Sequence, residues 1–144
     1  VTLSVIEFVS GWYMNKDADS DTFAKFLQCY FSEYYEPFKD IEVCKNFYKV
    51  FRNGLTHQWS PKGSGISMDI NGSWLIASNT LVGKEKILFL NLPKLYEIAK
   101  SAFKKFEESL DQDEKMRNKF EERYRKLLNL DYLQMRTLRK KLNL

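Results

Sequence analysis

The sequence predicts a mainly α-helical protein: a compact helical bundle with a small β-hairpin insertion around residues 66–90, all within a single domain of residues 1–144. Apolar residues recur every three to four positions through the first 58 residues and again after residue 92, a spacing typical of amphipathic helices. Between these blocks apolar and polar residues alternate, as they do in strands. A length of 144 residues suits one ordinary domain.

The first helix is expected over about residues 2–15. Its apolar stripe consists of Leu3, Ile6, Val9 and Tyr13. A polar, acidic run from Asp17 to Asp21 follows it. We expect Ser20 or Asp21 to cap the next helix, because short polar side chains accept hydrogen bonds from the free amide groups at a helix N-terminus.

Two further helices are expected before residue 60. The first carries a broad aromatic face, which we interpret as core, made of Phe23, Phe26, Leu27, Tyr30, Phe31 and Tyr34. Pro37 interrupts the pattern. The next helix has an apolar face made of Ile41, Cys44, Phe47, Tyr48, Phe51 and Leu55. It is expected to end near Trp59, because residues 60–65 have the composition of a loop.

The insertion between the helical blocks has the pattern of a hairpin. Ile66, Met68 and Ile70 alternate with polar residues, and residues 74–76 continue beyond them. Asn71–Gly72 is a favoured two-residue turn between paired strands. Residues 86–90 predict a third strand.

The C-terminal block predicts a long helix that opens at Leu92–Pro93, and a second helix that starts at Asp111 or Asp113, unless the two form one bent helix. Residues 100–144 hold 13 Lys or Arg and 8 Asp or Glu, a net charge of +5, whereas residues 1–99 have a net charge of −1. We therefore expect a basic C-terminal helix or tail over residues 112–144. Its basic residues either follow RNA phosphates or form a solvated helix face.

The composition excludes several kinds of site and location. The chain has one histidine, so a His-rich metal site or catalysis by two histidines needs a second chain. No apolar stretch reaches the roughly 18 residues of a membrane span. Cys29 and Cys44 match no metal-binding spacing, and we expect two buried, reduced thiols in a cytoplasmic protein.

One group of residues has the chemistry of a phosphate site: Arg52, Asn53 and His57, at the end of the third helix. Asn53 and His57 are four residues apart and lie on one helix face, whereas Arg52 lies about 140° around the axis from His57. A guanidinium binds phosphate oxygens with a permanent charge, and an imidazole moves protons at neutral pH. For RNA the 2′-hydroxyl supplies the nucleophile, so no metal or other cofactor is expected.

This Arg-Asn-x-x-x-His pattern in a helical chain resembles the HEPN superfamily (higher eukaryotes and prokaryotes nucleotide-binding) over about residues 1–60 and 92–128. The resemblance implies a metal-independent endoribonuclease in which His57 transfers protons, Arg52 binds the scissile phosphate and Asn53 orients it. It also implies a homodimer with two motifs facing one cleft, an RNA substrate, and an antitoxin protein as partner in a toxin–antitoxin or phage-defence system.

Three features depart from the family pattern. The hairpin insertion is an elaboration of the basic bundle, and Gly54 is unusual inside a helix. Trp59 stands where one subgroup of the family has a tyrosine.

A structural interpretation of the same residues remains open. Arg52 pairs with Glu42, Asp69 or another carboxylate, and His57 interacts with the last carbonyl groups of its helix. The chain is then a non-catalytic helical module that binds a protein or a nucleotide.

Overall fold

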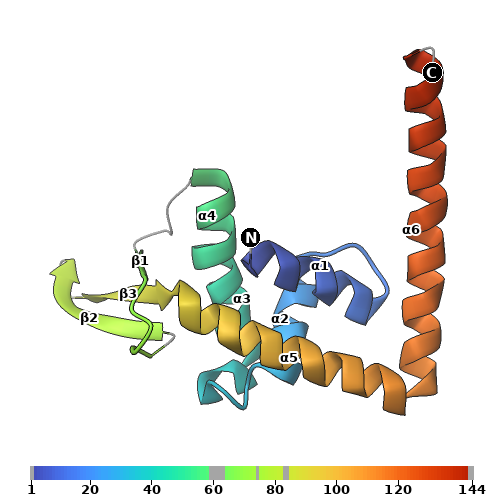
Figure 1. The fold of residues 1–144 in the computed structure, drawn as a ribbon. Coiled ribbons are helices and arrows are strands. Elements are labelled where there is room, and N and C mark those ends of the chain that lie inside the picture. The colour runs from blue at the N-terminus through green and yellow to red at the C-terminus, as the bar shows by residue number, and fades with distance from the viewer. Residues whose placement is uncertain (1, 59–63, 74, 83–84, 143–144) are drawn as a thin grey trace.

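The computed structural model describes residues 2–58, 64–73, 75–82 and 85–142, and within these ranges the side chains of residues 56–58, 75–82, 85–86 and 130–132 are not described. The described chain is mainly helical with a small sheet, which confirms the predicted fold class. Helix α5 runs between the sheet at one end of the molecule and helix α6 at the other (Figure 1). Of the described helices, none combines the length and apolar character that crossing a bilayer requires.

Helix α1 (Thr2–Met14) follows the predicted boundaries closely. It ends with Asn15 at a φ of 53°, in the left-handed region. The amide of Asn15 donates to the carbonyl of Trp12, and the amide of Lys16 donates to that of Gly11. This pair of hydrogen bonds is a Schellman motif, which satisfies the last carbonyl groups of the helix and turns the chain toward α2.

Helix α2 (Ser20–Tyr30) is capped by Asp19, so the expectation of Ser20 or Asp21 as the cap is wrong by one or two residues. The Asp19 carboxylate accepts a hydrogen bond from the amide of Thr22 at 2.7 Å, and the Thr22 hydroxyl accepts one from the Asp19 amide at 2.8 Å. This reciprocal arrangement is a capping box, and it makes Ser20 the first helical residue.

Replacing Asp19 with alanine should lower the free energy of unfolding by about 1 kcal/mol at neutral pH, because α2 loses its cap, whereas Asp19→Asn should be nearly neutral. The hydrogen bond from the Thr22 amide is the main cause that lowers the pKa of the Asp19 carboxyl. The ionised Asp19 carboxylate therefore contributes fully to the free energy of unfolding above its pKa in the unfolded chain. This contribution is lost as the pH falls through the lower pKa of the folded state. In urea titrations at decreasing pH, the free energy of unfolding should fall less steeply for Asp19→Asn than for the parent. Equal losses for both variants at neutral pH would contradict this assignment of the cap.

The predicted third helix is divided into segments. The short 3-10 helix η1 (Glu36–Lys39) precedes α3 (Ile41–Phe47), and α3 continues through the π-helical turn η2 (Tyr48–Arg52) into α4 (Asn53–Gln58). The amide of Asn53 donates to the carbonyl of Tyr48, five residues back. Trp59, where this helix was expected to end, lies outside the described residues.

The sheet differs from the predicted pairing. Strand β3 (Glu85–Asn91) is central, with β1 (Ser64–Ser67) parallel to it on one side and β2 (Leu75–Val82) antiparallel on the other. The chain does turn at Asn71–Gly72, where the Gly72 amide donates to the Asp69 carbonyl. The segments around this turn pair with β3 rather than with each other, so the hairpin of the insertion is β2–β3.

One close contact lies within this sheet, between β1 and β3, and another joins the end of β3 to helix α5. Gly65 lies opposite Phe89, and a Cβ atom on it would lie 2.2 Å from the phenyl ring, so the position favours glycine. Asn91 is fully buried at the end of β3. Its side chain accepts a hydrogen bond from the Lys94 amide, which caps α5, and donates one to the Asp69 carbonyl. The loop after β1 is thereby tied to the start of α5.

The last two helices are separate. Helix α5 (Leu92–Gln112) ends before Asp113, whose carboxylate accepts a hydrogen bond from the Met116 amide and caps α6 (Glu114–Lys141). Of the predicted alternatives, Asp113 is therefore the residue that starts the second helix. Helix α6 covers most of the predicted basic C-terminal segment and projects far beyond the rest of the molecule (Figure 1).

Aromatic side chains from α2, η1, α3, η2 and α5 make up about half of the described core. Phe26 and Tyr30 pack edge-to-face against Phe106, with ring centroids 5.8 and 5.7 Å apart. The interpretation of this aromatic face as core is thus confirmed from Phe23 to Phe31, whereas Tyr34 is half-buried and lies outside the core cluster. The other fully buried phenylalanines are Phe23, Phe31, Phe38 and Phe51.

The cysteines differ in environment. Cys44 is buried as expected, and burial raises the pKa of its thiol to about 12. Cys29 is exposed, with its sulfur 3.2 Å from the hydroxyl of Tyr13, so the expectation of two buried thiols is wrong for this residue.

Candidate functional site

The candidate site begins at the π-helical turn, which carries Tyr48 and Arg52. The Arg52 guanidinium lies over the Tyr48 ring, 5.5 Å from its centroid. Its Nε donates a hydrogen bond to Oε2 of Glu7 at 2.7 Å, and its Nη2 donates to the same oxygen. π-Helical turns insert an extra residue into a helix and are frequent at functional sites. Here the turn sets the direction in which Arg52 leaves the helix, toward α1.

Glu7 is the residue of this site that the sequence did not reveal. It comes from α1, and its other oxygen, Oε1, accepts a hydrogen bond from the Tyr48 hydroxyl at 2.8 Å. The carboxylates considered from the sequence, Glu42 and Asp69, do not form the described ion pair with Arg52. The structure places Glu7 on the buried side of α1, four residues after Leu3 and three before Ser10, and the local sequence pattern does not identify its partner. A carboxylate on the buried side of a helix requires a partner.

The Glu7–Arg52 pair is largely shielded from water. The Arg52 side chain is 18% exposed and that of Glu7 is 13% exposed. Burial, followed by the hydrogen bond to Glu7, raises the pKa of Tyr48 to about 12, so its hydroxyl remains a proton donor at neutral pH. The carboxylate therefore has donors on both oxygens, and the guanidinium is held in one place.

Asn53 and His57 follow directly in α4. The Asn53 side-chain oxygen accepts a hydrogen bond from Nη1 of Arg52 at 3.3 Å, so the structure brings these two predicted residues together. The backbone of His57 lies in α4, one helical turn after Asn53, and its side chain lies outside the described residues. Gly54 is buried in this helix.

The arrangement suits anion binding more than metal binding. A guanidinium already fixed by other side chains loses little rotamer freedom when it binds a phosphate oxygen, although the Glu7 carboxylate weakens its attraction for an anion. In the described part of the chain, no three acidic, cysteine or histidine side chains converge as a metal site would require.

The predicted motif stands without support from relatives. No protein-family model matches the chain, and no curated protein or solved structure is significantly similar to it. The resemblance to the HEPN superfamily therefore depends on residues 52–57 and their helical setting, and the function has to be argued from the geometry around Arg52.

Proposed function

We propose that this chain is a HEPN-like endoribonuclease that needs no metal ion. One observation carries the proposal: the Arg52 guanidinium is fixed by Glu7 and contacts Asn53, at the start of the helix that carries His57. A permanent cation, a polar amide and an imidazole within two helical turns are the groups that cleavage of a phosphodiester needs.

In the proposed reaction the 2′-oxygen of RNA loses its proton and attacks the neighbouring phosphorus. The bond from phosphorus to the 5′-oxygen breaks, and that oxygen takes up a proton. The products end in a 2′,3′-cyclic phosphate and a 5′-hydroxyl. Arg52 stabilises the charge that develops on the phosphate, Asn53 orients it, and His57 transfers one proton. In a homodimer, the His57 of the second copy transfers the other.

The biological setting follows the family resemblance. We propose a cytoplasmic protein of a toxin–antitoxin or phage-defence system, which acts on RNA as a homodimer and is inhibited by an antitoxin protein. Glu7 and Tyr48 are positioning residues in this proposal, because they contact Arg52 rather than the substrate.

Cleavage should persist in EDTA and should depend on the 2′-hydroxyl. Purified chain incubated with labelled RNA and excess EDTA should yield cyclic-phosphate and 5′-hydroxyl ends. The same oligonucleotide with 2′-deoxynucleotides at the cleaved positions should remain intact, because it lacks the nucleophile. Loss of cleavage in EDTA, or cutting of the deoxy substrate, would show that the proposed chemistry is wrong.

A second candidate function, a non-catalytic helical module that binds a protein or a nucleotide, is favoured by the low exposure of the same ion pair. A pair that joins α1 to the end of the third helix stabilises the fold whether or not a substrate binds. Under this proposal no RNA is cut at any protein concentration, and replacement of Arg52 lowers stability or nucleotide affinity only.

A further inference from the structure

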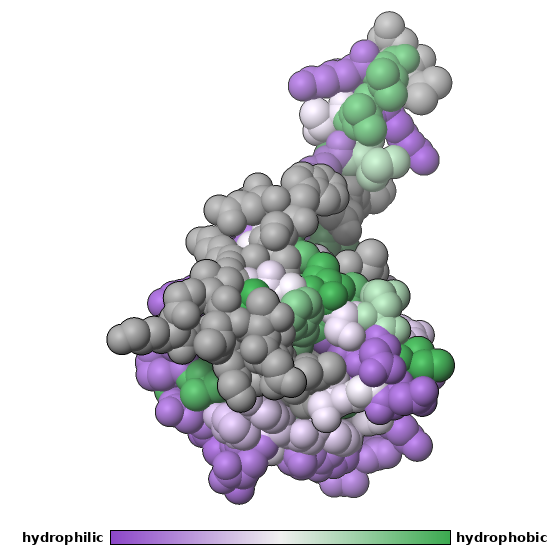
Figure 2. Space-filling model, turned by 90° about the vertical axis from the view of Figure 1, so that its left-hand side faces the viewer, coloured by the Kyte–Doolittle hydropathy of each residue, from purple (hydrophilic) through white to green (hydrophobic). Residues whose placement is uncertain are grey.

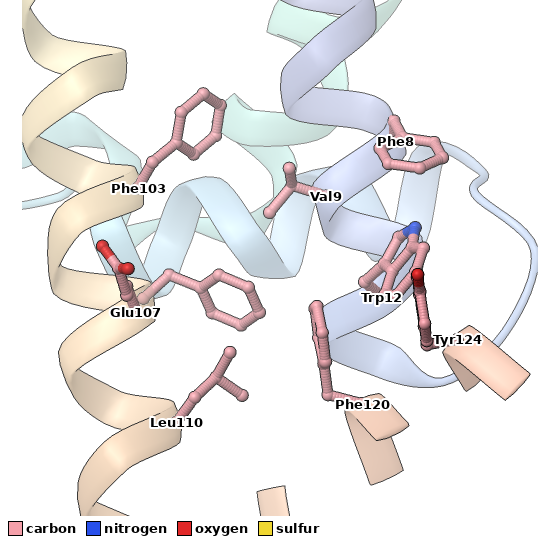
Figure 3. Close-up of a pocket in the computed structure, with 9 residues that line it drawn as sticks. Phe8, Val9, Trp12, Phe103, Glu107, Leu110, Phe120 and Tyr124 are labelled. Carbon is pink, nitrogen blue, oxygen red and sulfur yellow. The ribbon is translucent and has the colours of Figure 1, made fainter. Parts of the chain in front are cut away.

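A groove of about 540 Å³ lies between α1, α5 and α6, and its lining does not include Arg52 (Figure 3). Phe8 and Trp12 from α1, Phe106 and Leu110 from α5, and Phe120 and Tyr124 from α6 line it. Phe8 is 58% exposed and Tyr124 is 49% exposed, so large aromatic surfaces at its rim meet water. Exposed apolar area of this kind often marks an interaction site.

The groove continues along α6. At about 100° per residue, Phe120, Tyr124, Leu128, Met135 and Leu138 lie within a sector of about 80° on one face of the helix, and the backbone of Asp131 falls within the same sector. Leu128, Met135 and Leu138 are each about half exposed, and all residues from Leu133 to Leu142 are exposed. In Figure 2 the free end of α6 carries hydrophobic surface directly beside strongly hydrophilic surface.

The N-terminal part of α6 is held against α1 and the loop after it, which fixes the orientation of the helix and of its apolar stripe. The Trp12 ring packs against Phe120 and Tyr124, with centroids 4.6 and 5.8 Å apart. Arg123, which is 12% exposed, donates a hydrogen bond to Asp17 at 2.6 Å. The groove and the apolar stripe of α6, from Phe120 to Leu138, therefore follow one face of the helix over about 27 Å.

The charge beside the stripe selects its partner. Residues 132–144 hold four basic and no acidic residues, and Arg139 and Lys141 lie on opposite sides of the stripe. Residues 114–144 have a net charge of +6 and residues 1–113 a net charge of −2. Two copies that paired their α6 helices would therefore repel each other.

The groove favours a helix over other acidic partners. RNA phosphates would meet the basic residues but leave the apolar stripe in water. A flat bilayer surface would not fill a concave site between three helices. An amphipathic helix would cover the apolar surface and also meet the basic residues. Its apolar face would enter the groove, and acidic residues on its flanks would contact the basic side chains.

We propose that the groove and the apolar stripe of α6 bind a partner protein through an amphipathic helix of about 18 residues with acidic flanks. This surface shares no side chain with the Arg52 site, so the proposal is independent of ribonuclease activity.

The test uses two synthetic 18-residue helical peptides with the same leucine stripe, one flanked by glutamate and one by lysine. Fluorescence anisotropy with the full chain should detect binding of the glutamate peptide only. Met135→Glu and Phe8→Glu should each weaken this binding at least about tenfold, because they place a like charge on the apolar surface. Both residues are at least half exposed, so neither variant should unfold the protein.

Leu133→Glu is the matched control, since Leu133 is 57% exposed but lies on the opposite face of α6. It should leave peptide affinity nearly unchanged and so exclude a general effect of charge. Equal binding of both peptides, or unchanged affinity in either test variant, would overturn the proposal. Self-association that Met135→Glu abolishes, or tighter Met135-dependent binding to RNA or anionic vesicles than to the peptide, would also overturn it.

Discussion

Replacing His57 with alanine is expected to slow RNA cleavage in EDTA by at least about 100-fold, because proton transfer to or from the reacting oxygens loses its imidazole. Arg52→Lys should slow it by about 100- to 1,000-fold. The guanidinium contacts Glu7 through Nε and Nη2 and Asn53 through Nη1, and a lysine ammonium does not reproduce this fixed fork. Single-turnover rates with end-labelled RNA measure both effects.

The control for lost positive charge is Arg125→Ala on α6, where the Arg125 side chain is 78% exposed. Arg125→Ala removes one positive charge, whereas Arg52→Lys removes none. The Arg125→Ala protein should nevertheless cleave RNA at close to the parent rate. Thermal unfolding of each variant separates loss of function from loss of folding. A His57→Ala protein that remains folded and cleaves at the parent rate would exclude His57 from the reaction.

The predicted helices were accurate where the signal was local. The apolar spacing of α1 and the aromatic face of α2 were read correctly because each depends on neighbours within one or two turns. The cap of α2 was misplaced because Asp19, Ser20 and Asp21 all have suitable side chains. The geometry of the Asp19–Thr22 pair, rather than residue type, decides among them.

The features that were missed depend on contacts between distant parts of the chain. The sequence around Asn71–Gly72 favours a turn, and a turn forms, but strand pairing there is decided by β3, which pairs on both of its edges. The π-helical turn and the Glu7–Arg52 pair likewise depend on contacts between distant parts of the chain. Glu7 and Arg52 are 45 residues apart, and no local period connects them.

Helix packing also limits which residues of the candidate site could be predicted from the sequence. Arg52 and Asn53 are neighbours in sequence, and their contact is a consequence of local structure. The carboxylate that holds Arg52 enters only because α1 packs beside the third helix. Sequence reasoning could therefore propose the motif but could not identify the residue that fixes it.

Glu7→Ala is expected to lower the free energy of unfolding by about 2 kcal/mol, because it removes the carboxylate that pairs with the Arg52 guanidinium at 18% exposure and that accepts the hydrogen bond of the Tyr48 hydroxyl. Urea denaturation of Glu7→Ala, Arg52→Ala and the double variant measures the effect. The double variant should be less destabilised than the sum of the single variants, because each single variant already removes the whole Glu7–Arg52 interaction.

An exposed ion pair provides the matched control. Glu33 and Lys105 pair at 45% side-chain exposure each, and Glu33→Ala should change stability little. Additive effects of Glu7→Ala and Arg52→Ala would show that the pair is not coupled in solution.

In the ribonuclease proposal, Glu7→Gln keeps the fold but loosens Arg52, so KM for RNA should rise while cleavage remains resistant to EDTA. A stability loss without any change in KM would instead assign the Glu7–Arg52 pair to the architecture of the helical body alone.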